Sequence, residues 1–177
     1  LEYVSTCKSP QQMFGALVKT YYARRAGIDP KDIVSVSLMP CTAKKFEADR
    51  PEMASSGYQD VDIVLTSREL GRMIREVGID FRSLPDDEHD APMGISTGAA
   101  AIFGATGGVM EAALRTVYEV ATGLELPNID LEEVRGLEGI KEAEVMLGDV
   151  KVRVGVAHGL ANAKTILEMV RDKEREY

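Results

Sequence analysis

The sequence has few cysteines, no tryptophan and no long apolar run. Its only two cysteines, Cys7 and Cys41, lie far apart along the 177 residues. A small secreted scaffold held by disulfides needs more cysteines, and two thiols cannot form a four-thiolate metal site. No apolar run approaches the roughly 18 residues that span a bilayer, and residues 1–5 lack the basic start and apolar core of a signal peptide. These absences favour a reducing, cytoplasmic setting and predict no membrane insertion.

Basic residues are outnumbered by acidic ones. The chain has 21 lysines and arginines against 29 aspartates and glutamates, a net charge of −8. An acidic chain repels phosphate backbones and anionic lipid, so we expect no binding to nucleic acid or to membrane surfaces. The content of 45% hydrophobic and 28% charged residues is ordinary for a globular domain. The first residue is not methionine, which suggests a chain cut from a longer protein.

Strand-like and helix-like segments alternate along the chain, which predicts an α/β domain. Phe14, Leu17, Val18 and Tyr21 recur at helical spacing and predict an amphipathic helix over about residues 9–26, capped by Ser9 and Pro10. Further helices are expected after the capping-box pair Thr66 and Glu69, after Gly108 and from about Gly159. Strands are expected at 33–39 and 62–66, with a hairpin at 145–156 that turns at Gly148-Asp149. We expect a single domain with a mainly parallel sheet of roughly four strands, flanked by helices, plus this β-hairpin.

The segment from Met39 to Glu47 is the first candidate site. It follows a predicted buried strand, at the carboxyl end where open α/β sheets place their ligands. Backbone N–H groups and Lys44, one turn away, would favour the thiolate of Cys41, the form that binds metal or attacks electrophiles. The alternative is a buried cysteine that acts as a small hydrophobe beside solvated lysines. For Glu47, three residues after Lys44, the alternative is a helix-surface ion pair.

Two other segments give weaker signals. The glycine-rich loop at 103–108 precedes a helix and would present amide donors to an anion. It lacks the spacing of nucleotide-binding loops, and a tight strand-to-helix turn is the alternative. The segment 5–12 has helix capping as its alternative explanation. His89 and His158 have no partner evident in the sequence, so a structural or solvated role is the simpler interpretation.

Taken together, these segments resemble the catalytic domain of iron-only (FeFe) hydrogenases. The run Met-Pro-Cys-Thr-Ala-Lys-Lys-Phe-Glu-Ala-Asp-Arg-Pro at 39–51 matches the second of the three signature motifs of that family. The run Phe-Gly-Ala-Thr-Gly-Gly-Val-Met-Glu-Ala-Ala-Leu-Arg-Thr at 103–116 matches its characteristic loop and helix. The segments 8–12 and 134–141 also fit, so the likeness covers nearly the whole chain.

The resemblance implies a reaction and a cofactor. The family reduces protons reversibly to dihydrogen at the H-cluster, a 4Fe-4S cube joined through a cysteine sulfur to a two-iron unit with carbon monoxide, cyanide and a dithiolate bridge. Cys41 matches a cysteine ligand of the cube, and Lys44 matches the lysine that donates a hydrogen bond to a cyanide, as suits a compact ammonium. The other matches are Met39 packed against the two-iron unit, Pro10 and Gln11 near the other cyanide, Phe103 and Gly104 in the pocket wall, and Ser5 on the proton route. Cys7 matches no cluster ligand.

The family's first and third cysteine motifs are absent from the sequence, and they carry three of the four cube ligands and the thiol that delivers protons. We therefore expect residues 1–177 to be one α/β lobe, truncated at both ends, that binds no H-cluster alone and is inactive. The resemblance implies as partners the remaining hydrogenase domain, accessory iron-sulfur domains or subunits, and a ferredoxin-like or NADH-linked electron carrier. The alternatives are a lobe of a sensory or iron-sulfur-carrying relative without fast turnover, and a plain interaction domain without a cofactor.

Overall fold

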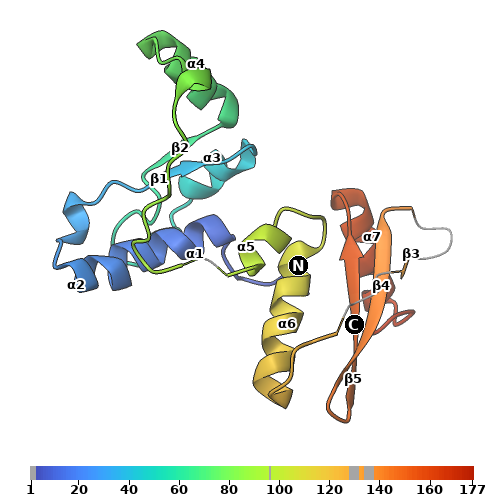
Figure 1. Cartoon of the computed structure of the whole chain (residues 1–177). Coiled ribbons are helices and arrows are strands. Elements are labelled where there is room, and N and C mark those ends of the chain that lie inside the picture. The colour runs from blue at the N-terminus through green and yellow to red at the C-terminus, as the bar shows by residue number, and fades with distance from the viewer. Residues whose placement is uncertain (1–2, 96, 128–131, 134–137) are drawn as a thin grey trace. The chain divides into compact units, whose positions relative to one another are not determined.

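The computed structural model describes residues 3–95, 97–127, 132–133 and 138–177. The chain forms two compact units, Leu1–Gly94 and Ile95–Tyr177, which we call unit 1 and unit 2 and describe separately (Figure 1). Helices and short strands alternate in unit 1, and unit 2 combines helices with a hairpin. The predicted α/β class is confirmed, whereas the description of residues 1–177 as one lobe stays a prediction.

Unit 1 begins with a helical run that is continuous from Pro10 to Ala26. It comprises α1 (Pro10–Leu17), a π-helical turn (Val18–Tyr22) and α2 (Ala23–Ala26), and it ends at Gly27 in the left-handed conformation. The predicted helix is confirmed, but its predicted apolar face is wrong. Phe14, Leu17 and Tyr21 are 43–53% exposed.

The buried face of this helical run is instead a stripe of polar and small residues, made of Gln11, Gln12, Gly15, Lys19 and Ala23. The reason is a close backbone approach. A Cβ atom at Gly15 would lie 2.4 Å from the carbonyl oxygen of Asp60, so the helix touches the 60–61 segment through its smallest residue. A larger apolar side chain cannot occupy that contact.

The parallel sheet of unit 1 has two strands in the described residues. β1 (Val36–Leu38) pairs in parallel with β2 (Ile63–Leu65), with Val36 opposite Ile63. The predicted sheet of roughly four mainly parallel strands is therefore not found, because the other described strands, in unit 2, are antiparallel. A parallel pair needs a long crossover, and in the described part of unit 1 such a crossover joins only β1 to β2.

This small sheet also corrects the prediction of a buried strand at 33–39. Val36 and Leu38 are 51% and 52% exposed. A small core cluster, made of Ala48, Val61 and Val64 with Met39 packed against it, joins α3 (Ala43–Ala48) to the sheet. Two short strands cannot bury both of their faces, so the apolar residues of β1 are only partly covered.

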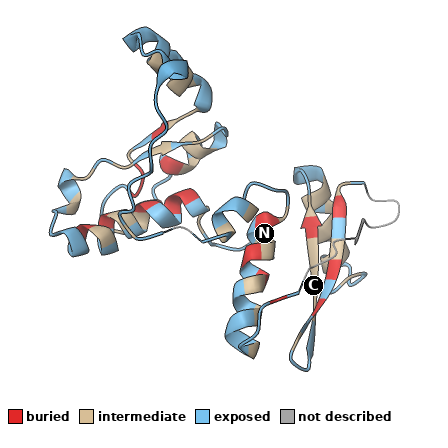
Figure 2. Ribbon diagram, in the orientation of Figure 1, coloured by how far each residue is buried: buried red, intermediate tan, exposed pale blue. Residues whose placement is uncertain are grey.

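Helix α4 (Ser67–Val77) begins at the predicted capping box. Thr66 accepts a hydrogen bond from the backbone N–H of Glu69, and the Glu69 carboxylate accepts one from the backbone N–H of Thr66. The helix ends at Gly78, and none of its residues is fully buried (Figure 2). Two short 3-10 turns complete unit 1, Pro30–Asp32 and Phe81–Ser83.

Unit 2 contains α5 (Ala99–Ile102), α6 (Gly108–Thr122), β3 (Glu132–Glu133), β4 (Ile140–Leu147), β5 (Val150–Ala157) and α7 (Leu160–Arg171). The three strands form one antiparallel sheet, and the predicted hairpin is confirmed, with Gly148 at φ 62° in the turn. Its core cluster consists of Leu114, Leu126 and Val145. Among the described residues no helix is long and apolar enough to cross a membrane.

Candidate functional site

Cys41 lies in the turn between β1 and α3, just past the carboxyl end of the strand. Its thiol is free and exposed. The carbonyl oxygen of Cys41 accepts a hydrogen bond of 3.2 Å from the backbone N–H of Lys44, in the first turn of α3. The sequence therefore placed this thiol correctly at a strand end with Lys44 one turn away, although the strand itself is not buried.

Helix α1 holds the start of α3 through Gln11. The Gln11 side chain is 6% exposed; its amide nitrogen donates to the backbone carbonyl of Lys44 at 3.3 Å. Its amide oxygen accepts a hydrogen bond of 2.8 Å from the hydroxyl of Ser37 on β1. Both ends of this amide are thus fixed, so the helix, the strand and the Cys41 turn are joined by one side chain.

A second connection runs from Ser9, the residue before α1, through Glu47 to the side chain of Lys44. The ammonium of Lys44 donates to the Glu47 carboxylate at 2.9 Å. The same carboxylate accepts hydrogen bonds from the backbone N–H of Ser9 at 3.1 Å and from its hydroxyl at 2.8 Å. Burial raises the pKa of Glu47, but the hydrogen bonds from Lys44 and Ser9 outweigh it and hold the pKa below its usual value.

The segment before α1 is anchored by Asp60, whose side chain is fully buried. Its carboxylate accepts from the ammonium of Lys8 at 2.7 Å and from the backbone N–H groups of Ser55 and Ser56, each at 3.2 Å. Burial raises the pKa of Asp60, while the bonds from Lys8 and Ser56 lower it by more. Residues 8–11 are therefore tied at Lys8, Ser9 and Gln11, and each of these ties reaches a segment more than 20 residues away.

The remaining predicted site residues of unit 1 lie around these ties. Pro10 is the exposed first residue of α1, and Met39 is half-buried against Ala48, Val61 and Val64. Ser5 is exposed, and its hydroxyl accepts a hydrogen bond of 3.0 Å from the backbone N–H of Cys7. Met39, Cys41 and Lys44 thus lie along the connection from β1 into α3, and Gln11, which follows Pro10 on α1, is bonded to the Lys44 backbone.

Phe103 and Gly104 belong to unit 2, in the turn between α5 and α6. The turn joins two helices, so the expectation of a strand before it is wrong, because Ala99–Ile102 is helical. The close fold of the turn requires glycine at Gly107, which has φ 84°, and at Gly108, where a Cβ would lie 1.8 Å from the carbonyl oxygen of Ile102. The hydroxyl of Thr106 in this turn lies 3.5 Å from Nδ1 of His158.

Ser9 and Glu47 lie in two candidate segments, but sequence reasoning did not predict that they bond to each other. Ser9 occupies the predicted N-cap position, but its side chain makes no capping bond and turns to Glu47 instead. The Glu47 ion pair with Lys44 was expected only as a surface contact. No local pattern reveals a bond between residues 38 positions apart, so the sequence carried no signal for it.

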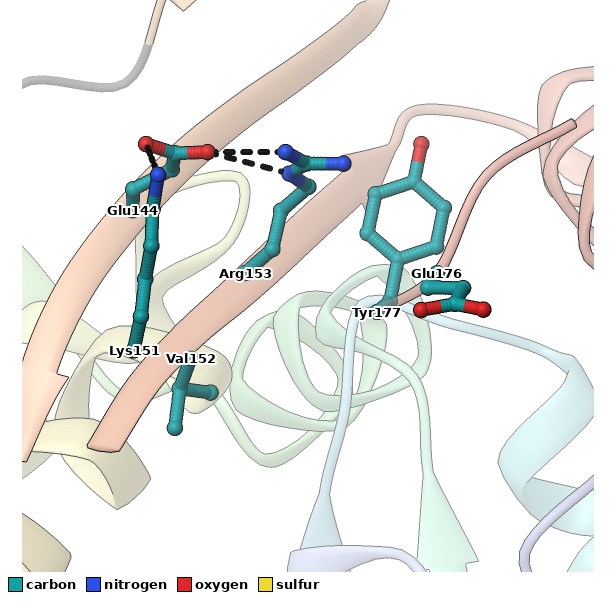
Figure 3. Close-up of a pocket in the computed structure, with 6 residues that line it drawn as sticks. All are labelled: Glu144, Lys151, Val152, Arg153, Glu176 and Tyr177. Atoms are coloured by element: carbon teal, nitrogen blue, oxygen red, sulfur yellow. Dashed lines mark hydrogen bonds and ion pairs between the residues drawn. The ribbon is translucent and has the colours of Figure 1, made fainter.

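Two cavities lie away from these residues. One, of about 410 Å³ in unit 2, is lined by charged residues, and Glu144 accepts from both Lys151 at 2.5 Å and Arg153 at 2.9 Å (Figure 3). The ring of Tyr177 closes one side of it (Figure 3). The other, of about 500 Å³, lies between α4 and the turn at 79–82 and is mainly apolar. Neither contains a predicted site residue.

The donor set at the β1–α3 turn fits one side of a metal cofactor and not a complete metal site. Among the described residues there is no group of three or more histidine, cysteine, aspartate or glutamate side chains able to hold a metal ion. What the turn offers is one exposed thiol, a soft iron ligand, and, three residues along the chain, one ammonium held by Glu47. Such a pair suits a cluster whose other ligands come from elsewhere.

Comparison with known proteins identifies the family. All of residues 1–177 match the model for the iron only hydrogenase large subunit, C-terminal domain. The chain is 57% identical over 168 residues to the NADP-reducing hydrogenase subunit HndD of Solidesulfovibrio fructosivorans, which covers 95% of this chain and 29% of that protein. It is 53% identical to the periplasmic iron hydrogenase large subunit of Nitratidesulfovibrio vulgaris, over 100% of this chain and 42% of that protein.

A solved structure agrees with these matches. The apo FeFe-hydrogenase HydA1 variant from Chlamydomonas reinhardtii superposes with a TM-score of 0.80 at 43% identity, over 99% of this chain and 51% of that chain. The chain thus spans about half of that hydrogenase and a smaller share of the curated relatives, which are larger proteins. It belongs to the family of the iron only hydrogenase large subunit, C-terminal domain.

Proposed function

We propose that this chain forms part of the catalytic domain of an iron-only hydrogenase, which reduces protons reversibly to dihydrogen at an H-cluster. The observation that carries the proposal is the bond from Gln11 to the backbone of Lys44, which joins α1 to the turn that holds Cys41. The two bonded residues lie 33 positions apart in the sequence. The sensory or iron-sulfur-carrying alternative has less support. Hydrogenases match at 50–57% identity, against 31% for the mouse cytosolic iron-sulfur assembly component 3.

The resemblance to the family implies a role toward the cofactor for each predicted site residue. Cys41 would supply one thiolate ligand of the 4Fe-4S cube. Lys44 would donate a hydrogen bond to a cyanide ligand, and Met39 would pack its thioether against the two-iron unit. Pro10 and Gln11 would approach the other cyanide, Phe103 and Gly104 would form part of the pocket wall, and Ser5 would carry protons. When bound, the cluster would relay electrons and provide the metal centre for proton reduction.

Because one cube ligand cannot hold a cube, we expect this chain alone to bind no H-cluster and to evolve no hydrogen. The other ligands would come from the remaining hydrogenase domain. Electrons would come through accessory iron-sulfur domains or subunits, supplied by a ferredoxin-like or NADH-linked carrier. The cytoplasmic setting remains a prediction, since one matched relative is periplasmic by name. Stoichiometric iron and sulfide in the purified chain would contradict the expectation of an empty lobe.

The test is made in the full-length parent with two variants at the site. Cys41→Ser should remove or degrade the cube and abolish turnover, because a hydroxyl is a poor ligand for a soft iron-sulfur site. Lys44→Asn should leave the cube in place but lower the occupancy of the two-iron unit, and hydrogen evolution should fall in proportion. Iron content, infrared bands of carbon monoxide and cyanide, and hydrogen evolution are measured on both.

Neighbouring residues provide matched controls. Cys7 is also a free, exposed cysteine, so Cys7→Ser tests whether any thiol loss has the same effect. Lys45 follows Lys44 but pairs with Glu69 instead, at 2.8 Å, so Lys45→Asn tests the loss of a lysine from α3. Both controls should keep a full cluster and normal turnover. Normal iron content and activity in Cys41→Ser would refute the assignment.

A further inference from the structure

The side chain of Glu47 connects two segments that both belong to the candidate site. It is 14% exposed, and both of its oxygens are in use: Oε1 accepts from the backbone N–H of Ser9, and Oε2 accepts from the Ser9 hydroxyl and from the Lys44 ammonium. The Lys44 side chain is 30% exposed, so its ammonium keeps access to the surface. Glu47 therefore ties the lysine of α3 to the first residue before α1.

We propose that Glu47 is a positioning residue, held by Ser9, that fixes the direction of the Lys44 ammonium and balances its charge. This inference deepens the proposed function and rests on it for the identity of the acceptor, a cyanide ligand. Lys44 then acts as an oriented hydrogen-bond donor within a neutral pair. It does not act as a freely moving cation.

The chemistry of lysine makes such a device necessary. An ammonium on a four-carbon stem is a compact point charge with three rotatable donors, and by itself it has no preferred direction. One donor of Lys44 is spent on Glu47, which leaves two for an acceptor on the open side. Because the Glu47 carboxylate is itself held by two hydrogen bonds from Ser9, it cannot follow the lysine to another position.

The neighbouring pair shows what an ordinary surface contact looks like on the same helix. Lys45 and Glu69 lie 2.8 Å apart, with side chains 39% and 40% exposed. Besides Lys45, Glu69 is bonded to Thr66 at the start of α4. An exposed ion pair of this kind contributes little to the stability of the fold. Glu69→Gln is therefore a matched control for Glu47→Gln, since each removes one carboxylate charge from one lysine of α3.

The first experiment uses this chain without a cofactor. Lysine amines are acylated with limiting acetic anhydride, and mass spectrometry gives the rate at each position. Glu47→Gln should raise the rate at Lys44 by about threefold or more, because the ammonium is no longer held, and leave Lys45 unchanged. Glu69→Gln should do the reverse. Ser9→Ala, which keeps the ion pair but removes a hydrogen bond to Glu47, should raise the Lys44 rate by less.

The second experiment uses the full-length parent and reads the cyanide bands in the infrared. Glu47→Gln should change the position of the cyanide bands and lower their intensity per cube, because the Lys44 ammonium is no longer held in the direction of its acceptor. Glu69→Gln should leave both unchanged. A purely structural role for Glu47 would change neither the position of the bands nor the relative rates at Lys44 and Lys45.

The outcomes separate the two proposals. If the parent with Glu47 intact shows no cyanide bands, the proposed function fails, while the acylation rates still decide whether Glu47 positions Lys44. If the bands are present but keep their position and intensity in Glu47→Gln, the inference is overturned. An unchanged acylation rate at Lys44 in both Glu47→Gln and Ser9→Ala overturns it as well.

Discussion

Different kinds of contact stabilise the interior of each of the two units of the chain. All four buried polar side chains among the described residues lie in unit 1, at Gln11, Gln12, Lys19 and Asp60. The core cluster of unit 2 is apolar and consists of Leu114, Leu126 and Val145. Unit 1 therefore combines a small apolar cluster with buried directional bonds, whereas the buried side chains described in unit 2 are apolar.

This difference follows from what each unit positions. Hydrogen bonds and ion pairs fix atoms in direction as well as distance, and in unit 1 they fix the residues around Cys41. Fixing atoms by buried polar bonds has an energetic cost, because a buried polar group stabilises the fold only when its hydrogen-bond partners are in place. Lys19 is paired with Asp62 at 2.8 Å, but both amide atoms of the fully buried Gln12 lack a partner in the structure.

Removal of the Asp60 carboxylate is the most direct test of whether buried polar bonds stabilise unit 1. Asp60→Ala leaves the Lys8 ammonium and the backbone N–H groups of Ser55 and Ser56 without their acceptor. We expect unit 1 to lose about 4 kcal/mol, as when one partner of a buried ion pair is removed. Hydrogen exchange should show the loss in residues 8–66, with unit 2 unchanged. Glu52→Ala is the control, because its ion pair with Arg50 is exposed and should contribute nothing measurable.

The corresponding change in unit 2 is Leu114→Ala. Leu114 is 8% exposed and packs in the cluster with Leu126 and Val145. Truncation leaves a cavity among apolar side chains, for which we expect about 3 kcal/mol of destabilisation. Loss of exchange protection in α6 and β4, with the amides of α1 and β1 unchanged, would support separate cores. Equal loss in both units would contradict the comparison.

Two glycines sharpen the comparison, because the same substitution should have opposite signs. Gly15 faces the backbone of Asp60 at a distance that no Cβ can occupy, and Gly71 in α4 has nothing within 4 Å of an added Cβ. We expect Gly15→Ala to cost about 2 kcal/mol through overpacking. Gly71→Ala should stabilise by about 0.5 kcal/mol through helix propensity and reduced chain entropy. Thermal denaturation of both variants against the parent chain is sufficient, and equal signs would refute the close contact.

Features set by local residues could be predicted from the sequence. The capping box at Thr66, the helix that follows it and the Gly148-Asp149 hairpin all depend on neighbouring residues, and all are confirmed. The position of Cys41 between a strand and a helix was predicted for the same reason. The family resemblance added the proposed role of Cys41 as a cluster ligand, where the local pattern left a ligand and a buried hydrophobe as alternatives.

Features set by distant residues could not be predicted. The apolar stripe at Phe14, Leu17 and Tyr21 indicated the wrong buried face, because the close approach of Gly15 to Asp60 determines which side of the helix is covered. The bond between Ser9 and Glu47 spans 38 positions and leaves no periodic trace. The predicted sheet of roughly four mainly parallel strands is not found in the described residues for a similar reason, because strand pairing depends on which distant segments meet.

The smallest expected effect concerns the one strongly shifted carboxyl group on α4. Hydrogen bonds from Lys45 and then from Thr66 lower the pKa of Glu69 from 4.5 to about 2. A carboxyl group whose pKa is lower in the folded state stabilises the fold at pH values above its unfolded-state pKa. This contribution disappears as the pH falls from about 4.5 to about 2. Glu69 is exposed, so the effect should be local to the start of α4.

The measurement is a comparison of the parent chain with Glu69→Gln at each pH. The glutamine variant retains a side chain able to bond to Thr66 but has no charge to lose, so titration of all other carboxyl groups affects both proteins alike. Amide protection at the start of α4 should differ most at pH 6, decline through pH 4 and become equal near pH 2. A difference that is constant across this range would show that the Glu69 charge does not stabilise the start of α4. The exposed ion pair with Lys45 would then contribute no stability, in contrast to the buried polar bonds of unit 1.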